Sequence, residues 1–468
     1  SNQEIEVNEE HNYTLTIKFK ETNDNQDDNK GKTFSTVIRI NEVRDISLYQ
    51  DNSGANIPEL FDGMIPVYYS DGKTLLADTT KEWYDYDKHN WANAVLVSNP
   101  SDYLESDGTP KEDKVNQEVS DILQYYVWIP RYKYELFSNA TNISSLVNSG
   151  NTPEQMINIE FVETNVKNDN TKSQANGYNK GETYVHPAFT FGDTELSGIW
   201  VGKFETTGAA ATPTILPNNR SLTSMTVSAQ FNASRSIEGN YGTNTSEIDT
   251  HMMKNMEWGA VAYLSASKYG LYKDASTCNN SDNTVTGVGC QIWINNVHTQ
   301  ANNNWGPSIT GCSALTSMND GVRNNTTACG TGYEWNGSVN NGRSSTTGNL
   351  YGIYDMSGGA WEYVMGNRGS STSVYVTQNS GFTSQPESKY IDIYEATSSN
   401  TDHSKGKLGD ATREVLKTYG NVNGGWYSDY AYFVESSYAW FARGGCYASG
   451  AFAGAFYFSR NTGTSYAY

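Results

Sequence analysis

Two carboxylates in a segment rich in glycine and aromatic residues are the groups best placed to do chemistry. Asp355 and Glu362 lie within residues 349–363, and two neighbouring carboxyl groups can act as general acid and general base. Their surroundings favour another role, because residues 357–359 supply turn chemistry and Trp361 supplies a large buried anchor. We therefore predict that both carboxylates are hydrogen-bonded parts of a structural turn.

Five cysteines are the next candidates for chemistry. None of their spacings is Cys-x-x-Cys, so a zinc or redox site is only weakly indicated. We predict two local disulfides, Cys278 with Cys290 and Cys312 with Cys329, which are typical of an oxidising compartment. Cys446 is left over, and the alternative for the other four is reduced surface thiols in a cytosolic protein.

Metal ligands are sparse. The histidines occur singly, without a pair at ligand spacing, at His11, His89, His186, His251, His298 and His403. Residues 21–31 carry Asp24, Asp27 and Asp28, and this acidic loop is either a solvated tip or a calcium site. Apart from that loop, we expect no metal and no cofactor.

The composition restricts the partners. The chain has 468 residues and a net charge of −20, which repels nucleic acid and anionic lipid. Charged residues make up 18% and aromatic residues 13%, with 33 tyrosines, a composition typical of contact surfaces. No run of about 20 apolar residues occurs, so we expect no direct membrane insertion.

Three regions follow from the patterning. Residues 1–50 alternate apolar and polar side chains at 13–19 and 34–40, which predicts a β-rich, immunoglobulin-like unit. Residues 51–120 read as a small β spacer unit. Its short aromatic strands are expected at residues 63–69, 83–87 and 91–95. Residues 121–468 are expected to form one domain with long irregular loops.

One α-helix is predicted in that domain. Asp249 or Thr250 is a suitable N-cap, and Gly270 suits the position after the last turn. Met252 and Met256 share one face with later apolar residues, and this face is predicted to be core.

Four segments occur in the order of a known family's motifs. Residues 349–363 resemble the Gly-Leu-x-Asp-Met-x-Gly-Asn-x-Trp-Glu-Trp signature of formylglycine-generating-enzyme-like C-type-lectin folds. Residues 199–206 are similar to that family's strand motif ending in Lys-x-Glu-Val-Thr, and residues 256–263 to its helix motif. Residues 443–445 are similar to its Arg-Gly-Gly.

This resemblance implies an α+β protein, with a β-rich N-terminal stalk followed by a C-type-lectin-fold head. It also implies scaffold roles for Asp355, Gly358, Trp361, Glu362, Arg443, Gly444 and Gly445.

The enzymes of the family are not expected here. Formylglycine-generating enzymes bind copper through two cysteines after the Arg-Gly-Gly, and the matching positions hold Ser449 and Gly454. The related iron-dependent sulfoxide synthases need clustered histidines, which this sequence lacks. Catalysis as a metal oxidase of either kind is kept only as an alternative.

The C-terminal segment resembles another branch of the fold. Residues 440–468 are similar to the variable region of C-type-lectin-fold proteins that retroelements diversify, in which scaffold residues alternate with positions altered at template adenines. The Phe-Arg-containing end that usually follows is missing, so we expect the chain to be truncated after Tyr468.

The resemblance implies that the non-scaffold positions of residues 446–466 contact a ligand. They are Cys446, Tyr447, Ala448, Ser449, Ala451, Phe452, Tyr457, Ser459, Asn461, Thr462, Thr464, Ser465 and Tyr466. The upstream residues Tyr427, Tyr430, Tyr432 and Tyr438 extend the same composition, which suits recognition surfaces.

The sequence thus predicts a non-enzymatic binding protein, extracellular, on a cell surface or on a virion, that recognises a protein or glycan and can be oligomeric. A calcium-dependent sugar lectin and a structural subunit of a pilus or virion are the remaining alternatives.

Overall fold

The computed structural model describes residues 47–136, 157–167, 182–240, 248–271, 291–299, 306–314, 323–324, 328–330, 334–336, 342–369, 379–395, 397, 399–416 and 418–465. The chain divides into two units, Ser1–Ile46 and Ser47–Tyr468. The division lies close to the predicted boundary at residue 50. The predicted hairpin and acidic loop of the first unit lie outside the described residues.

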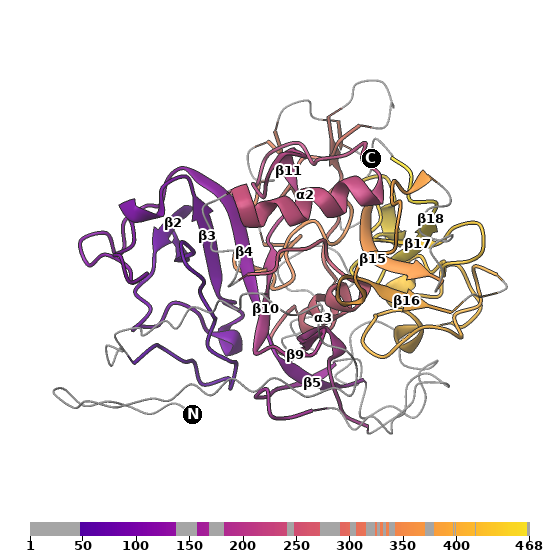
Figure 1. Cartoon of the computed structure of the whole chain (residues 1–468), viewed down its shortest axis with the longest axis horizontal. Helices are drawn as coiled ribbons and strands as arrows, with labels where there is room; N and C mark the ends of the chain where they lie inside the picture. The colour runs from indigo at the N-terminus through magenta and orange to yellow at the C-terminus, as the bar shows by residue number, and fades with distance from the viewer. Residues whose placement is uncertain are drawn as a thin grey trace, which may run out of the picture. The chain divides into compact units, whose positions relative to one another are not determined.

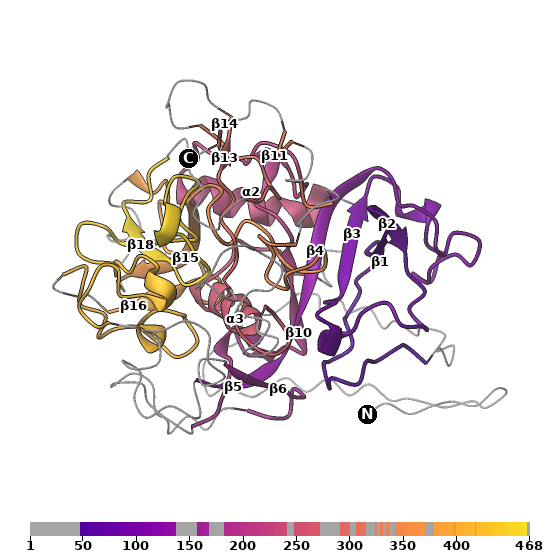
Figure 2. The same cartoon turned by 180° about the vertical axis from the view of Figure 1, so that it is seen from behind.

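The largest sheet of the second unit has five antiparallel strands. Their order is β10 (Gly198–Gly202), β4 (Ile122–Pro130), β3 (Asn93–Val97), β1 (Ile65–Ser70) and β2 (Lys73–Leu76). Figure 1 labels β2, β3, β4 and β10, and Figure 2 also labels β1. Three of these strands come from the predicted spacer, and β3 pairs with β4 along most of its length. Residues 51–120 are therefore not a separate unit, because their strands complete a sheet of the expected head.

A second sheet contains the C-terminal motifs. Its order is β16 (Asp392–Tyr394), β15 (Glu362–Arg368), β17 (Trp440–Arg443) and β18 (Phe458–Asn461). Strands β15 and β16 are parallel, and the other pairs are antiparallel. Glu362 is opposite Arg443 in the register, so two of the predicted scaffold motifs meet at this end of the sheet.

The remaining strands form small sheets, several of which are visible from behind in Figure 2. They are β5 (Tyr132–Glu135) with β6 (Asn158–Phe161) and β7 (Tyr184–Val185), β8 (Thr190–Phe191) with β9 (Thr194–Glu195), β11 (Thr207–Ala209) with β12 (Thr212–Thr214), and β13 (Val297–His298) with β14 (Arg323–Asn324).

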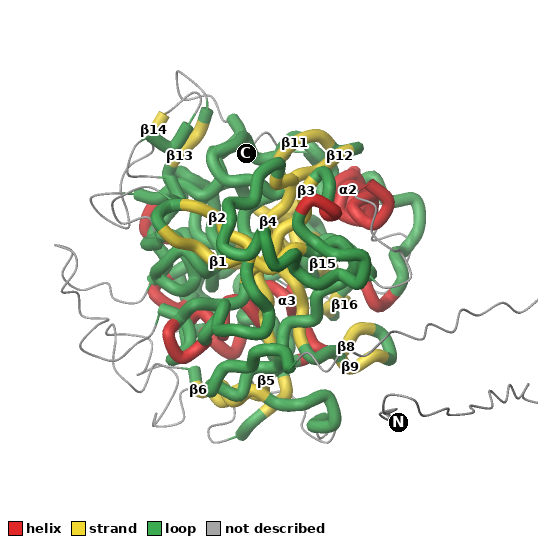
Figure 3. The backbone as a smooth tube through the Cα atoms, turned by 90° about the vertical axis from the view of Figure 1, so that its left-hand side faces the viewer, coloured by secondary structure: helices red, strands yellow, loops and turns green. Residues whose placement is uncertain are grey.

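Short 3-10 helices and loops make up much of the rest, as Figure 3 shows. The 3-10 helices are η2 (Tyr86–Lys88), η3 (Pro100–Asp102), η5 (Pro187–Phe189), η7 (Ser388–Tyr390), η8 (Arg413–Val415), η9 (Trp426–Ser428) and η10 (Gly450–Phe452). The predicted strand at residues 83–87 is wrong, because Asp85 accepts a hydrogen bond from the Lys88 backbone and caps η2. The described chain is β-rich.

Two α-helices occur among the described residues, α2 (Val227–Asn240) and α3 (Asn255–Ser265). Every residue of α3 is buried, which confirms the prediction that its apolar side chains are core. The predicted start at Asp249 or Thr250 is wrong, because the Glu257 carboxylate accepts the Lys254 N–H at 2.7 Å and starts the helix there. The helix also ends earlier than predicted, with its C-cap at Ala266.

The disulfide between Cys312 and Cys329 is confirmed, with the two Cα atoms 5.3 Å apart. Cys278 and Cys290 lie outside the described residues, and Cys446 is a buried free thiol. None of the helices in the described part of the chain is long and apolar enough to span a bilayer.

Candidate functional site

Lys203 joins two of the sequence motifs. Its Nζ donates to the carbonyl oxygens of Leu350 at 2.6 Å and Gly352 at 2.9 Å, and to Asn93 Oδ1 at 2.9 Å. The side chain is fully buried, and burial holds its pKa well below the usual value. Lys203 therefore fixes the loop that leads to Asp355.

Asp355 is saturated with hydrogen bonds. Its carboxylate accepts from Asn295 Nδ2 at 2.9 Å, from the Gly311 N–H at 2.9 and 3.0 Å, and from the Glu205 N–H at 3.3 Å. Burial raises its pKa to about 6 despite these donors. With its oxygens engaged in the turn, Asp355 has the contacts of a structural residue.

Glu205 was not singled out in the sequence as a site residue, although it ends the Lys-x-Glu motif. Its Oε1 accepts from the Ala360 N–H at 2.7 Å and its Oε2 from Ser308 Oγ at 2.7 Å. A Cβ on Gly359 would collide with Glu205 Oε1, so this contact requires glycine. Burial, together with repulsion by Asp355 and Glu362, holds the pKa of Glu205 well above its usual value.

Glu362 differs from both neighbours. It begins β15, is half-buried, and has no hydrogen-bond donor among the described residues. Burial and then repulsion by Asp355 hold its pKa well above the usual value. Since Asp355 is saturated, the two groups do not form the acid and base pair considered above. Of the three carboxyl groups of Glu205, Asp355 and Glu362, only that of Glu362 has no partner among the described residues.

Glu362 lines a cavity of about 1360 Å³. The cavity is bounded by residues of β4, β10, α2, α3 and β15, and Figures 1 and 2 show how these elements are arranged. Its aromatic lining residues include Phe61, Trp128, Phe191, Trp200, Trp258 and Trp361. Its acidic lining residues are Glu59, Asp193, Glu205, Asp249, Glu257, Glu362 and Glu387. We call this space the aromatic cavity.

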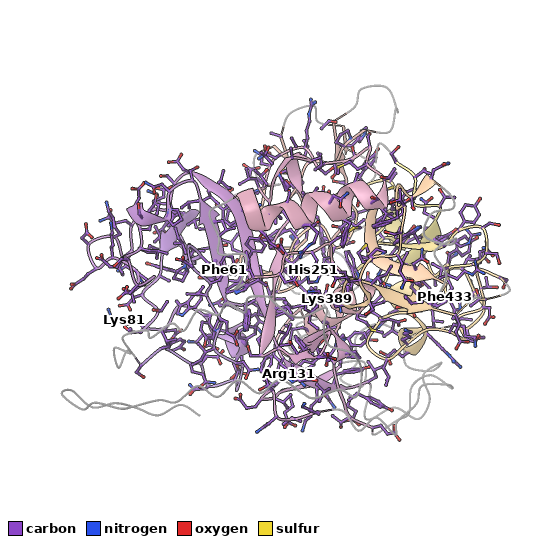
Figure 4. All side chains as sticks on the ribbon, viewed as in Figure 1. Phe61, Lys81, Arg131, His251, Lys389 and Phe433 are labelled. Atoms are coloured by element: carbon purple, nitrogen blue, oxygen red, sulfur yellow. A yellow bond between two sulfur atoms is a disulfide. The ribbon has the colours of Figure 1, made fainter. Side chains whose placement is uncertain are left out.

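The basic groups of the aromatic cavity already have partners. His251 Nε2 lies 3.0 Å from Glu257 Oε1, and Lys389 Nζ lies 2.6 Å from Asp249 Oδ2. Figure 4 labels His251 and Lys389, and both lie against the Phe191 ring. Phe191 stacks on His251 with ring centroids 4.8 Å apart. The side of the aromatic cavity that carries His251 and Lys389 is therefore an ion-pair network covered by the Phe191 ring.

The predicted ligand-contact residues fall into three groups by exposure. Cys446, Tyr447 and Tyr457 are buried, at 3%, 2% and 4% exposure. The half-buried group is Ala448, Ser449, Ser459, Asn461, Thr462 and Thr464, and the exposed group is Ala451, Phe452 and Ser465. Tyr466 lies outside the described residues.

The buried group does not reach the surface of the free chain. Tyr447 stacks on His298 with centroids 4.6 Å apart, and its hydroxyl accepts the Gly306 N–H at 3.2 Å. Tyr457 stacks beneath Tyr430. Cys446, Tyr447 and Tyr457 are therefore packed inside the free chain, and their contact with a ligand stays a prediction.

Arg460 of this segment and three upstream tyrosines form a continuous row, which we call the tyrosine–arginine row. The Arg460 guanidinium lies 4.4 Å from the Tyr438 ring centroid and 4.9 Å from that of Tyr432. The ring centroids of Tyr432 and Tyr430 lie 4.4 Å apart. Glu435 holds Arg460 Nε at 3.0 Å. Tyr438 is 38% exposed, and the other three row residues are half-buried.

The Arg-Gly-Gly motif is internal. The Arg443 side chain is fully buried, lies 5.7 Å from the Trp258 ring centroid, and donates to the Ala411 carbonyl at 3.3 Å. Gly444 and Gly445 have φ of 75° and 80°, a region that favours glycine. These are contacts of a scaffold.

The positions that match the copper cysteines also have structural contacts. Ser449 Oγ accepts the Cys446 N–H at 2.9 Å, and a Cβ on Gly454 would collide with Asp429. Nowhere in the described ranges do three or more His, Cys, Asp or Glu side chains gather as a metal site.

No protein-family model matches this sequence, and no curated protein is significantly similar to it. The resemblance to formylglycine-generating-enzyme-like C-type-lectin folds therefore rests on the four sequence motifs.

Proposed function

We propose that this chain is a non-enzymatic binding protein that displays a diversified C-type-lectin-fold surface to recognise a protein or glycan target. The observation that carries the proposal is the tyrosine–arginine row beside the predicted variable segment. Tyrosine and arginine dominate the energetics of protein interfaces, because they combine large contact area with polar groups.

The row is held in place before any target binds. Arg460 is fixed between two rings and by Glu435, so little side-chain freedom is left to lose on binding. Ala451 and Phe452 add exposed positions next to it, since the Tyr430 N–H donates to the Phe452 carbonyl at 3.1 Å. Variation at exposed positions of this kind changes the surface without disturbing the core.

The setting proposed is extracellular, on a cell surface or on a virion. The Cys312–Cys329 disulfide supports it, because such bonds persist in oxidising compartments. The net charge of −20 opposes a nucleic-acid partner.

The test is to sequence this gene and its flanks in several related isolates. Codon differences confined to residues 446–466, with a near-copy repeat carrying adenines at those codons and a neighbouring reverse transcriptase gene, are expected. A uniform segment without a reverse transcriptase would overturn the proposal of diversification. Copper or iron bound stoichiometrically to the purified protein would instead favour the metal-oxidase alternative.

A further inference from the structure

We propose that the aromatic cavity is a second binding site, whose ligand is an organic cation with an ammonium or guanidinium group that pairs with Glu362. This inference does not depend on the proposed function, because the cavity and the tyrosine–arginine row are lined by different residues.

The cavity is large enough for an elongated ligand. Its volume of about 1360 Å³ exceeds the range of roughly 300–1000 Å³ that is usual for small-molecule sites. Trp128 and Trp200 lie on the β4 and β10 side with ring centroids 5.2 Å apart, and Trp200 is half-buried. Indole faces attract ammonium and guanidinium groups as well as apolar surface.

The charge of the lining is unbalanced. Seven of the lining side chains are carboxylates and two are basic. Both basic groups already form ion pairs, His251 with Glu257 and Lys389 with Asp249. The lining therefore has an excess of acidic groups, which complements a cationic ligand.

Two of the acidic lining residues, Glu205 and Glu362, lie close to each other and to Asp355 behind the lining. The Asp355 carboxylate repels both, and none of the three has a basic partner within the described chain. Glu205 and Asp355 are engaged with backbone and side-chain donors, whereas Glu362 is not. Glu362 is thus the group available to a ligand.

An aromatic ring lies beside that carboxyl group. Both groups lie against Gly444. A Cβ placed on Gly444 would be 3.4 Å from the edge of the Trp258 indole and 3.6 Å from Glu362 Oε2. The apolar indole edge excludes water from one side of the carboxyl group, and a charge-assisted hydrogen bond to an ammonium or guanidinium group is stronger in such a setting. Asn461, one of the predicted variable positions, also lines the cavity, so substitution there would alter the same site.

Ionisation of Glu362 couples this site to pH. An incoming cation favours the carboxylate form, so binding releases a proton wherever Glu362 is protonated in the free protein. Affinity for a cation should therefore increase as pH rises from 5.5 to 8. A neutral ligand would not show this dependence through Glu362.

The experiment is isothermal titration calorimetry of the whole chain with three probes at constant ionic strength. The probes are spermidine, a blocked trilysine peptide and the neutral trisaccharide cellotriose. We expect at least one cation to bind at pH 8, and Glu362→Gln to weaken that binding tenfold or more. Tighter binding of spermidine would identify a free polyamine-like ligand, and tighter binding of the peptide a basic peptide segment.

Two matched variants are the controls. Glu118→Gln removes the same charge from an exposed pair with Lys73 and should leave cation affinity unchanged. Arg460→Ala alters the tyrosine–arginine row and should also leave it unchanged, which keeps this test separate from the proposed function. An equal loss in Glu118→Gln would mean that only net charge matters, and would overturn the site.

Other outcomes would also overturn the inference. They are no binding of either cation at 10 mM, or binding of cellotriose alone with equal affinity in Glu362→Gln. If Glu362→Gln does not fold, the pH profile of the unsubstituted chain decides, because weaker cation binding at pH 8 than at pH 5.5 contradicts pairing with Glu362.

Discussion

Two glutamates line the aromatic cavity from different elements and have opposite electrostatic environments. Glu257 on α3 faces His251 and Lys254, and although burial opposes ionisation, these cations lower its pKa to about 2. Glu362 on β15 has no such partner, and burial raises its pKa. Residue type and cavity are the same in both cases, so the presence of a neighbouring cation decides the charge of a buried carboxyl group.

The two carboxyl groups differ in whether the fold already uses them. The Glu257 carboxylate starts α3 and neutralises two basic groups, so the fold uses it fully. The Glu362 carboxyl group makes no ion pair or hydrogen bond within the described chain. A group of the second kind is free to respond to a ligand or to pH.

Glu257→Gln removes the carboxylate that pairs with His251 and Lys254, and it should cause the largest loss of stability. It leaves His251 and Lys254 without their shared carboxylate inside the protein, for an expected loss of about 3–5 kcal/mol of unfolding free energy. Urea denaturation at pH 7 measures it, with Glu118→Gln as an exposed control. A loss below about 1 kcal/mol would show that the network is not structural.

Lys203→Met tests a buried cation held by neutral oxygens alone. It would leave the carbonyl oxygens of Leu350 and Gly352 without their hydrogen-bond donor, and we expect a loss of about 3 kcal/mol of unfolding free energy. The midpoint of urea denaturation gives the result. If the variant were as stable as the parent, the loop before Asp355 would have to be fixed by other contacts.

Acidification from pH 8 to pH 5 should stabilise the fold by about 2 kcal/mol. Carboxyl groups with raised pKa values, such as Asp355 and Glu362, bind more protons folded than unfolded in this window, so stability falls as pH rises. The raised pKa of His251 acts in the same direction above pH 6.5. Burial lowers the pKa values of His186, His298 and His403, which opposes part of this gain below pH 6.5. Thermal melting across the range measures the slope, and a rise in stability towards pH 8 would contradict these shifts.

Glu362→Gln should reduce the dependence of stability on pH. At pH 8 the variant is expected to be about 1 kcal/mol more stable, because a group that resists ionisation is replaced by a neutral amide. At pH 4.5 the two proteins should melt together, since Glu362 is then protonated in the folded chain. Destabilisation at both pH values would indicate that Glu362 makes a structural contact.

Tyr432→Ser should change stability by less than about 0.5 kcal/mol, because its ring lies on the half-buried tyrosine–arginine row. Thermal melting provides the measurement. A larger loss would place the row in the core and weaken its assignment as a recognition surface.

Strands were more predictable than helices. Strands β1 and β3 were predicted from the short aromatic runs at residues 63–69 and 91–95, because that signal is local in the sequence. Helix α2 was missed because only a few of its positions, among them Val227 and Ile237, are buried, and its serines and asparagines disfavour a helix. Its stability comes from tertiary packing that no local pattern reports.

The candidate site was predictable only in part. The turn residues after Asp355 indicated a structural carboxylate, as its four hydrogen bonds support. The stacking of Tyr447 on His298 joins residues far apart in sequence, so its burial was not readable from composition. The role of Glu205 was hidden for the same reason, since its donors come from Ser308 and Ala360.

The pairing of β3 with β4 determines how small a working fragment can be. A fragment starting at residue 121 would lack β1, β2 and β3, and the β4 backbone groups that now bond to β3 would form an open edge. Such an edge is a template for intermolecular strand addition, so the fragment should self-associate. The shortest monomeric piece that preserves the aromatic cavity should therefore begin near Ser47, well upstream of the first recognisable motif.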